Sequence, residues 1–225
     1  MTADDRTTGR PDGRTYRVKE IFGPTIQGEG LHQGQPCYFL RLAGCNAWDG
    51  RPETRAASAC PYCDTDFRGG EALSLAELLA RLPPQDAPGT TPLGLVLTGG
   101  EPLLQVDAAL LEALAQRFPW IDIETNGTRP CPPRPAQVFL SCSPKTVAGQ
   151  PIVLEPDWWK ILIPAQETHL DRALASGKPV FVQPTCPDDG PRGEGYGQAL
   201  ARCLDLCYRH GCRLSVQLHK YLGVP

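Results

Sequence analysis

Three cysteines in one polar segment are the first residues whose spacing could support chemistry. Cys60 and Cys63 are separated by two residues, a spacing at which two thiolates can bind one metal centre. Cys45 precedes Cys60 by a gap of fourteen residues. A closed zinc site needs four ligands, so it would have to recruit a distant residue such as His32 or Cys37. A 4Fe–4S cluster held by only three thiolates would instead leave one iron open to a substrate or cofactor. The spacing leaves both kinds of site open, as well as thiols that bind no metal.

Polar motifs at the ends of apolar runs form the second set of candidate residues. They are TGGEP (98–102), ETNG (124–127), SPK (143–145) and QPTC (183–186). The loops that follow parallel strands gather at one edge of the sheet, where ligands bind. We therefore expect these motifs and the cysteine segment to converge in space, although they are far apart in the sequence.

The apolar runs themselves predict strands. Most are nearly continuous in Val, Ile, Leu and Phe, as strands buried on both faces are. We predict strands at 37–44, 93–98, 120–125, 137–142, 158–163, 179–184 and 213–218, and an edge strand at 15–22. Helical patterns lie between several of them, at 74–82, 107–118, 167–176 and 196–211.

The alternation of strands and helices indicates βα units and a parallel sheet. A complete eight-unit barrel needs roughly 250 residues, whereas this chain has 225. The connections 126–136 and 143–157 also look too short or too rich in proline to hold a helix. The sequence therefore predicts an α/β fold, a partial and open βα barrel with six or seven mostly parallel strands.

The overall composition restricts the class of protein. A net charge of −3 offers no basic surface for nucleic acid, and no apolar run approaches the roughly 20 residues of a membrane-spanning helix. Residues 1–14 hold no apolar segment, so we expect a disordered lead-in there and a single domain over 15–225. We expect a cytoplasmic location with reduced thiols. The ten cysteines are then ligands or small buried side chains rather than disulfides.

The ordered set of motifs resembles one enzyme family. Three cysteines after the first barrel strand and a glycine-rich GGEP after the second are typical of radical S-adenosylmethionine enzymes. The usual spacing in that superfamily is CxxxCxxC, whereas this chain has CX14CxxC. Together with TIQGEG, CDTDF, ETNG, SPK and the ending HKYLGVP, the expanded spacing resembles the 7-carboxy-7-deazaguanine synthase family over residues 15–225.

The resemblance implies a lyase with three cofactors: a 4Fe–4S cluster, S-adenosylmethionine and Mg²⁺. The open iron would bind S-adenosylmethionine, and one electron would cleave it to give the radical that takes a hydrogen from the substrate. The family's substrate is 6-carboxy-5,6,7,8-tetrahydropterin, whose ring contracts with loss of ammonia to 7-carboxy-7-deazaguanine, on the route to queuosine. The implied partners are a flavodoxin- or ferredoxin-like electron donor and a second copy of the chain in a homodimer. The protein's task is to orient and shield the cofactor chemistry.

The resemblance also implies a role for each matching residue. The cluster ligands are Cys45, Cys60 and Cys63, and the magnesium ligand is Thr65. The residues implied to contact S-adenosylmethionine are Tyr62, Asp64, Gly100, Glu101, Glu124, Asn126, Ser143, Pro144, Lys145, Gln183 and Pro184. Those implied to contact the pterin are Ile26, Gln27, Gly28, Glu29, Arg41, Thr98 and the terminal Pro225.

Structural explanations stay open for several of these side chains. Tyr62 could pack against the cluster loop, Thr65 could cap its turn, and Arg41 could form an ion pair. Glu124 and Asn126 could belong to a turn at the end of a strand. Two other functions also stay open. One is another radical S-adenosylmethionine enzyme, such as a glycyl-radical activating enzyme, and the other is a non-catalytic α/β module stabilised by zinc.

Seven cysteines match no expected ligand: Cys37, Cys131, Cys142, Cys186, Cys203, Cys207 and Cys212. Cys203 and Cys207 are four residues apart, on one face of the last long helical pattern. Small buried side chains are the simpler explanation, and a second metal site is the alternative. His219, near the C-terminus, could support the substrate pocket or have a structural role.

Overall fold

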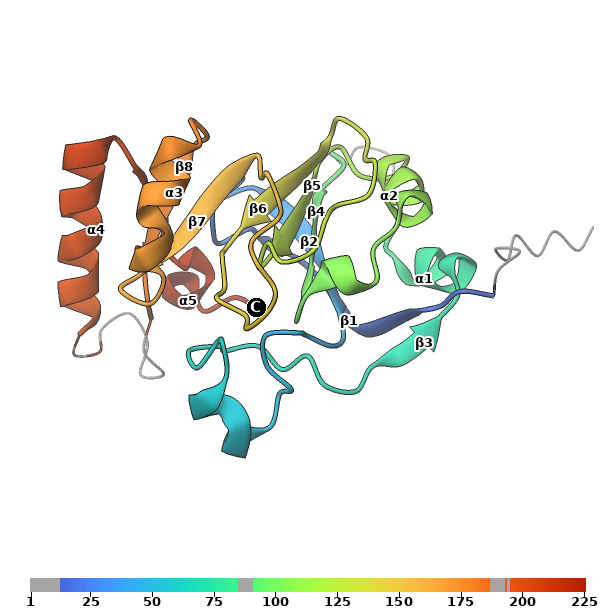
Figure 1. Cartoon of the computed structure of the whole chain (residues 1–225). Coiled ribbons are helices and arrows are strands. Elements are labelled where there is room, and N and C mark those ends of the chain that lie inside the picture. The colour runs from blue at the N-terminus through green and yellow to red at the C-terminus, as the bar shows by residue number, and fades with distance from the viewer. Residues whose placement is uncertain (1–12, 85–90, 187–192, 194) are drawn as a thin grey trace, which may run out of the picture.

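The computed structural model describes residues 13–84, 91–186, 193 and 195–225 (Figure 1). Residues 1–12 of the expected lead-in lie outside this part of the chain. The strands are β1 (Tyr16–Ile26), β2 (Pro36–Leu42), β3 (Glu71–Leu73), β4 (Gly94–Gly99), β5 (Ile121–Thr125), β6 (Val138–Cys142), β7 (Trp158–Ile163), β8 (Val180–Pro184) and β9 (Arg213–Leu214). The α-helices are α1 (Leu75–Arg81), α2 (Ala108–Ala115), α3 (Leu170–Ala175), α4 (Tyr196–His210) and α5 (Leu218–Leu222). Short 3-10 helices are η1 (Pro52–Ala57), η2 (Pro102–Leu104) and η3 (Glu167–His169).

The nine strands of the described residues form one sheet, in the order β3-β1-β2-β4-β5-β6-β7-β8-β9. Seven of them, β2 and β4 to β9, run parallel to one another. The predicted open sheet of mostly parallel strands is confirmed, and the connections 126–136 and 143–157 hold no helix, as expected. The sheet has nine strands rather than six or seven because β1 and the short β3 extend one edge in the antiparallel direction.

Alternate residues of the parallel strands point to opposite faces of the sheet. Leu40, Leu97 and Ile123 belong to the hydrophobic core. Their sequence neighbours Arg41 and Thr98 instead line a cavity on the other face. The core lies between the sheet and its helices, which pack around the outside in Figure 1, with α4 against β8 and α1 beside β1. The part of the opposite face at the C-terminal ends of the strands is therefore left for polar side chains such as Arg41 and Thr98.

Capping residues define where several helices begin and end. Ser74 and Glu77 form the predicted capping box at the start of α1, and Asp107 caps α2. Gly211 ends α4 in the left-handed conformation that favours glycine, with φ of 68°. None of the helices in the described residues combines the length and the apolar character that spanning a bilayer requires.

The strand predicted at 213–218 is wrong beyond its first two residues. Ser215 is fully buried and its N–H still donates to β8, but the chain then leaves the sheet and enters α5. The N–H of Leu218 donates to the carbonyl of Gly28 at 3.0 Å. α5 therefore packs beside the loop that follows β1 and brings the C-terminus near the ends of the central strands (Figure 1).

Candidate active site

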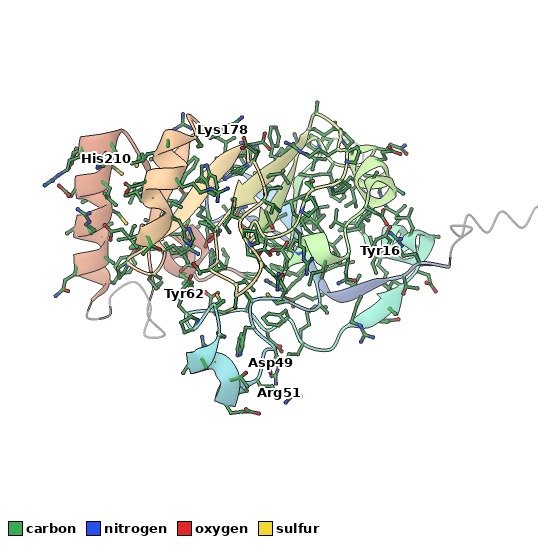
Figure 2. All side chains as sticks on the ribbon, viewed as in Figure 1. Tyr16, Asp49, Arg51, Tyr62, Lys178 and His210 are labelled. Atoms are coloured by element: carbon green, nitrogen blue, oxygen red, sulfur yellow. The ribbon has the colours of Figure 1, made fainter. Side chains whose placement is uncertain are left out.

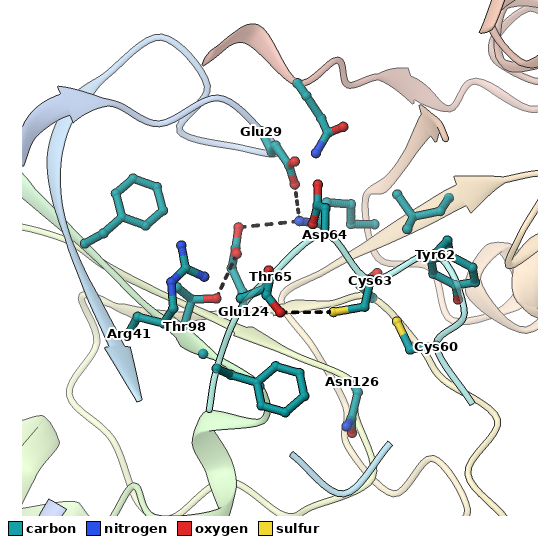
Figure 3. A pocket seen from close by; sticks show the side chains of 18 of the residues that line it. Glu29, Arg41, Cys60, Tyr62, Cys63, Asp64, Thr65, Thr98, Glu124 and Asn126 are labelled. Carbon is teal, nitrogen blue, oxygen red and sulfur yellow. Dashed lines mark hydrogen bonds and ion pairs between the residues drawn. The ribbon is translucent and has the colours of Figure 1, made fainter. Parts of the chain in front are cut away.

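A cavity of about 800 Å³ opens at the C-terminal ends of the parallel strands. The loops that follow β2, β4, β5, β6 and β8 all contribute to its wall, so the polar motifs and the cysteine segment meet there. Of the site residues predicted from the sequence, all but Gly28, Glu101 and Pro144 line this cavity. Figure 3 shows how several of them point toward one another from different elements.

The three cysteines of the expected cluster site, Cys45, Cys60 and Cys63, line the cavity together. A hydrogen bond from the Cys60 thiol lowers the pKa of Cys63 to about 6, against the opposing effect of burial. Burial raises the pKa of Cys45. Because the thiolate is the metal ligand, a bound centre must displace these protons. Three thiols that face one cavity, one of them already biased toward the thiolate, fit a cluster held by three sulfurs.

The fourteen residues between the first two cluster cysteines form an arm that contains η1. Figure 2 shows Asp49 and Arg51 at the end of this arm farthest from the sheet. Arg55 reaches back from η1, and its guanidinium donates to the carbonyl of Pro61 at 3.1 Å and to the carbonyl of Cys63. The arm therefore fixes the backbone on either side of Tyr62.

His32 and Cys37 do not lie with the three cysteines. Cys37 is near the start of β2, whereas Cys45 follows the end of that strand. The imidazole of His32 contacts the carboxylate of Asp122 at 2.8 Å and stacks on Trp120, with ring centroids 4.2 Å apart. The suggestion that either residue supplies a fourth zinc ligand is wrong, because both occupy the opposite end of the strands.

Gln166, in the loop after β7, connects the cluster loop to the sheet. Its amide nitrogen donates to the hydroxyl of Tyr62 at 3.2 Å and to that of Ser143 at 3.1 Å. Its amide oxygen accepts the N–H of Leu162 at 3.0 Å, which orients the whole side chain. Lys145 lies 5.6 Å from the centroid of the Tyr62 ring, and burial lowers the pKa of this lysine. These contacts fix the Tyr62 ring at the cavity wall.

Glu101 lies behind the wall and joins two strand ends. Its carboxylate is 1% exposed and accepts from the hydroxyl of Thr125 at 2.8 Å and from the N–H of Asn126 at 2.7 Å. Burial raises the pKa of this carboxyl. At the adjacent Gly100, a Cβ would lie 2.3 Å from the carbonyl oxygen of Gly44. The contact of Glu101 with a cofactor stays a prediction, whereas its contacts between β4 and β5 are structural.

Gly28 and Pro144 also lie outside the lining residues. A Cβ on Gly28 would be 2.2 Å from Nδ1 of His219, so glycine makes room for the imidazole there. His219 lines the cavity, which favours the supporting role over a purely structural one. Pro144 lies between two residues of the SPK motif whose side chains line the cavity.

Another part of the wall comes from β1, β2 and the C-terminus. Gln27 is buried, with 3% exposure, and lines the cavity. The Nε of Arg41 donates to Glu20 at 2.7 Å, so the ion pair left open by the sequence is present, and the guanidinium lines the cavity as well. The hydroxyl of Thr25 donates to the terminal oxygen atom of Pro225 at 2.8 Å. The last residue of the chain is thereby held in the cavity wall.

Thr65 lines the cavity two residues after the last cluster cysteine. Its carbonyl oxygen lies 3.9 Å from the sulfur of Cys63. Across the described ranges, no group of three His, Cys, Asp or Glu side chains is arranged to hold a single metal ion. Mg²⁺ keeps several waters and binds proteins through few oxygens, so a site at Thr65 would draw its other ligands from substrate and solvent. The magnesium role stays a prediction.

Three further residues that were not predicted as site residues also line the cavity: Lys160, Gln217 and Lys220. Lys160 had a signal, because it is the one charged residue in the apolar strand WWKILI, and buried lysines are rare unless paired. Gln217 had none, since only the turn into α5 brings it to the site. Lys220 belongs to the ending HKYLGVP but was assigned no role. Lys220 contacts Asp64 at 2.9 Å and so connects α5 to the cluster loop.

Comparisons with known proteins agree with this arrangement. No family model matches the chain. The 7-carboxy-7-deazaguanine synthase of Bordetella pertussis is 41% identical over 224 residues, which cover 93% of this chain and 99% of the relative. The Burkholderia multivorans protein of the same name is 40% identical, with 94% of this chain and 100% of the relative covered. The crystal structure of QueE from Escherichia coli superposes with a TM-score of 0.67 at 25% identity, covering 91% of this chain and 95% of that one. The chain therefore belongs to the 7-carboxy-7-deazaguanine synthase family.

Proposed function

We propose that this protein catalyses the radical S-adenosylmethionine-dependent ring contraction of 6-carboxy-5,6,7,8-tetrahydropterin to 7-carboxy-7-deazaguanine, with loss of ammonia. The observation that carries the proposal is that the cluster cysteines and the residues expected at the substrate line one cavity. The identity of 40% and 41% to enzymes with that name supports the same reaction. The product belongs to the synthesis of 7-deazapurines such as queuosine.

We assign Cys45, Cys60 and Cys63 to a 4Fe–4S cluster. When bound, the cluster and S-adenosylmethionine supply the one-electron chemistry that opens the reaction. The contribution of the chain is to hold that chemistry in place and to keep water away from it. Arg55 holds the backbone of the cysteine pair, and the ring of Tyr62 covers the adjacent wall.

We assign the strand ends beside this cysteine loop to S-adenosylmethionine. Carbonyls, hydroxyls, carboxylates and an ammonium from five loops suit a ligand that carries both an amino acid group and a nucleoside. The cavity residues concerned are Tyr62, Asp64, Gly100, Glu124, Asn126, Ser143, Lys145, Gln183 and Pro184. Glu101 and Pro144 would act from behind this wall.

We assign the remaining wall to the pterin. Gln27 can both donate and accept, which suits an amide-like ring edge. Arg41 can bind the substrate carboxylate with two parallel N–H groups. Thr65 would contribute its hydroxyl to Mg²⁺, with the substrate carboxylate and waters as further ligands. The other pterin contacts are Ile26, Glu29, Thr98 and Pro225, with Gly28 behind them.

The working protein would be a cytoplasmic homodimer that receives electrons from a flavodoxin- or ferredoxin-like donor. The open sheet supports self-association, because an uncovered sheet edge invites pairing. β9 forms one edge of the sheet, and its Leu214 is 38% exposed.

Anaerobic reconstitution with iron and sulfide, followed by reduction in the presence of S-adenosylmethionine and the carboxytetrahydropterin, tests the function. We expect 5′-deoxyadenosine and 7-carboxy-7-deazaguanine to form together. Deoxyadenosine without deazapurine would contradict the substrate assignment and favour another radical S-adenosylmethionine enzyme. Failure to form either product from a fully loaded protein would contradict the cofactor assignment as well.

A further inference from the structure

A buried lysine lies between two carboxylates in the cavity wall. Lys160, in β7, contacts Glu29 in the loop after β1 and lies 3.4 Å from Glu124 in β5. The side chain of Lys160 is 9% exposed, and those of Glu29 and Glu124 are 12% and 23% exposed. The dashed lines from Glu29 and Glu124 in Figure 3 mark these contacts. The three side chains come from three different parts of the fold and meet only at the cavity.

One ammonium between two carboxylates leaves this trio with an uncompensated negative charge. An ionised carboxylate offers about four lone-pair positions. The described contacts occupy two on Glu124, from Lys160 and from the Thr98 hydroxyl at 3.1 Å. On Glu29 the donors are Lys160 and the amide of Gln217. Because both carboxylates line the cavity, the remaining positions suit N–H donors from a ligand.

The protonation states of Lys160 and Glu29 depend on each other. Burial is the largest single effect and would raise the pKa of Glu29. Attraction to Lys160 and a hydrogen bond from it, with smaller effects of His219 and Gln217, together outweigh burial, and the pKa is lowered. Burial alone would lower the pKa of Lys160, but its two carboxylate partners raise it above the ordinary value. A lysine held in this way stays protonated in the neutral range and is a poor proton donor. The other titratable groups that act on the trio or on one of its members are Lys145, Asp122, His219 and Cys37.

We propose that Lys160 is a positioning residue, which holds Glu29 and Glu124 as two ionised acceptors for N–H groups at the edge of the substrate's ring. The inference rests on the proposed function, because a reduced pterin presents ring N–H and amino groups along one edge. It moves Glu124 to the substrate, whereas the sequence resemblance, and the cofactor assignment above that follows it, placed this residue at S-adenosylmethionine. In this inference the Lys160 ammonium attracts and holds the two carboxylates, and it does not transfer a proton.

Substrate binding by the reconstituted holoenzyme, without reductant, tests this role independently of turnover. With S-adenosylmethionine present, the carboxytetrahydropterin is titrated calorimetrically into the wild type, Lys160→Met and Lys160→Arg at several pH values in the neutral range. At neutral pH we expect Lys160→Met to weaken binding roughly ten- to a hundredfold, the cost of losing hydrogen bonds to charged groups. Binding by this variant should weaken further as the pH falls, because the buried Glu29, without its cation, takes up a proton at higher pH. The wild-type dissociation constant should stay flat.

The variant Lys160→Arg separates the effect of the positive charge at position 160 from the effect of where Glu29 and Glu124 lie. It keeps the cation but displaces the two carboxylates, so we expect a smaller loss of affinity and a flat pH dependence. This variant still tests the proposal if Lys160→Met does not fold, because unchanged affinity in Lys160→Arg would contradict a positioning role. Lys178→Met is the matched control, since Lys178 is exposed at the opposite end of β8 (Figure 2) and should bind as the wild type does.

Three results would overturn the inference. In the first, Lys160→Met binds the pterin as tightly as the wild type. In the second, its loss of affinity is the same at every pH. In the third, its affinity for S-adenosylmethionine falls as much as its affinity for the pterin, which would indicate general damage to the site. Failure of the wild type itself to bind the pterin is a different result, since it removes the proposed function and this inference together.

Discussion

Gln166 holds the cofactor side of the cavity together although no motif contains it. Its amide joins the hydroxyls of Tyr62 and Ser143, which come from the cluster loop and from the end of β6. Lys160 has the comparable position on the substrate side, between Glu29 and Glu124. Both act on residues that the sequence motifs identify, and both are buried. The precise geometry of the motifs thus depends on residues outside them.

Replacement of Gln166 by leucine should weaken the cofactor site while leaving the fold in place. The variant removes the hydrogen bonds of Gln166 to Tyr62, Ser143 and the N–H of Leu162. Loss of the neutral bond that orients Tyr62 costs about 1 kcal/mol, so we expect the KM for S-adenosylmethionine to rise roughly fivefold. Iron content should not change. Steady-state formation of deoxyadenosine measures the effect, with the neighbouring Glu167→Gln as the matched control. A KM equal to that of the wild type would show that Gln166 does not position Tyr62.

Two elements distant in sequence depend on each other at Gly28. The loop after β1 approaches α5 so closely that the imidazole of His219 occupies the space of a side chain at position 28. The hydrogen bond from Leu218 to the Gly28 carbonyl, at 3.0 Å, holds the two together. This contact places both the TIQGEG loop and the C-terminal helix at the cavity.

Gly28→Ala should therefore disturb stability and substrate binding together. The new Cβ would lie 2.2 Å from Nδ1 of His219, and overpacking of this kind costs about 1–3 kcal/mol. We expect a lower melting temperature of the apo-protein and a higher KM for the pterin. Adding His219→Ala to the Gly28→Ala background should recover part of the melting temperature, because it removes the clash. If the melting temperature of the double variant does not recover, the clash with His219 is not the cause of the destabilisation.

The contact between Leu218 and Gly28 also shows why some elements could be predicted from the sequence and others could not. The parallel strands and α1, α2 and α4 follow from local patterns, such as the apolar runs and the capping residues Ser74 and Asp107. The segment 213–218 alternates like a strand, yet it turns into α5 after two paired residues. Its course depends on the contact between Leu218 and Gly28, nearly the whole chain apart, and no local pattern encodes such a contact. For the same reason, no local pattern places Gln217 at the cavity.

In the whole molecule, an early and a late segment of the chain meet at the cavity: the region of β1 and the C-terminal segment that follows β9. β1 lies at the antiparallel edge of the sheet, and the C-terminus returns to it after the last parallel strand. Thr25 holds Pro225 by a hydrogen bond of 2.8 Å. Pro225 therefore belongs to the cavity wall, and Thr25 is the partner that the motif HKYLGVP did not reveal.

A peptide extension after Pro225 should consequently impair substrate binding. The extension would convert the terminal carboxylate to an amide and crowd the hydrogen bond to Thr25. We expect the dissociation constant of the pterin to rise at least tenfold, whereas cleavage of S-adenosylmethionine without substrate should persist. An N-terminal tag of the same length is the control. Full turnover by the C-terminally extended protein would remove the C-terminus from the site.

The most direct test of the account is electron paramagnetic resonance of the reduced, oxygen-free protein, with iron and zinc measured on the same sample. We expect about four irons per chain and a cluster signal that changes when S-adenosylmethionine binds. Substitution of Cys45, Cys60 or Cys63 by alanine should abolish that signal. One zinc ion per chain with no cluster signal would contradict the assignment of the three thiols, and with it the radical chemistry.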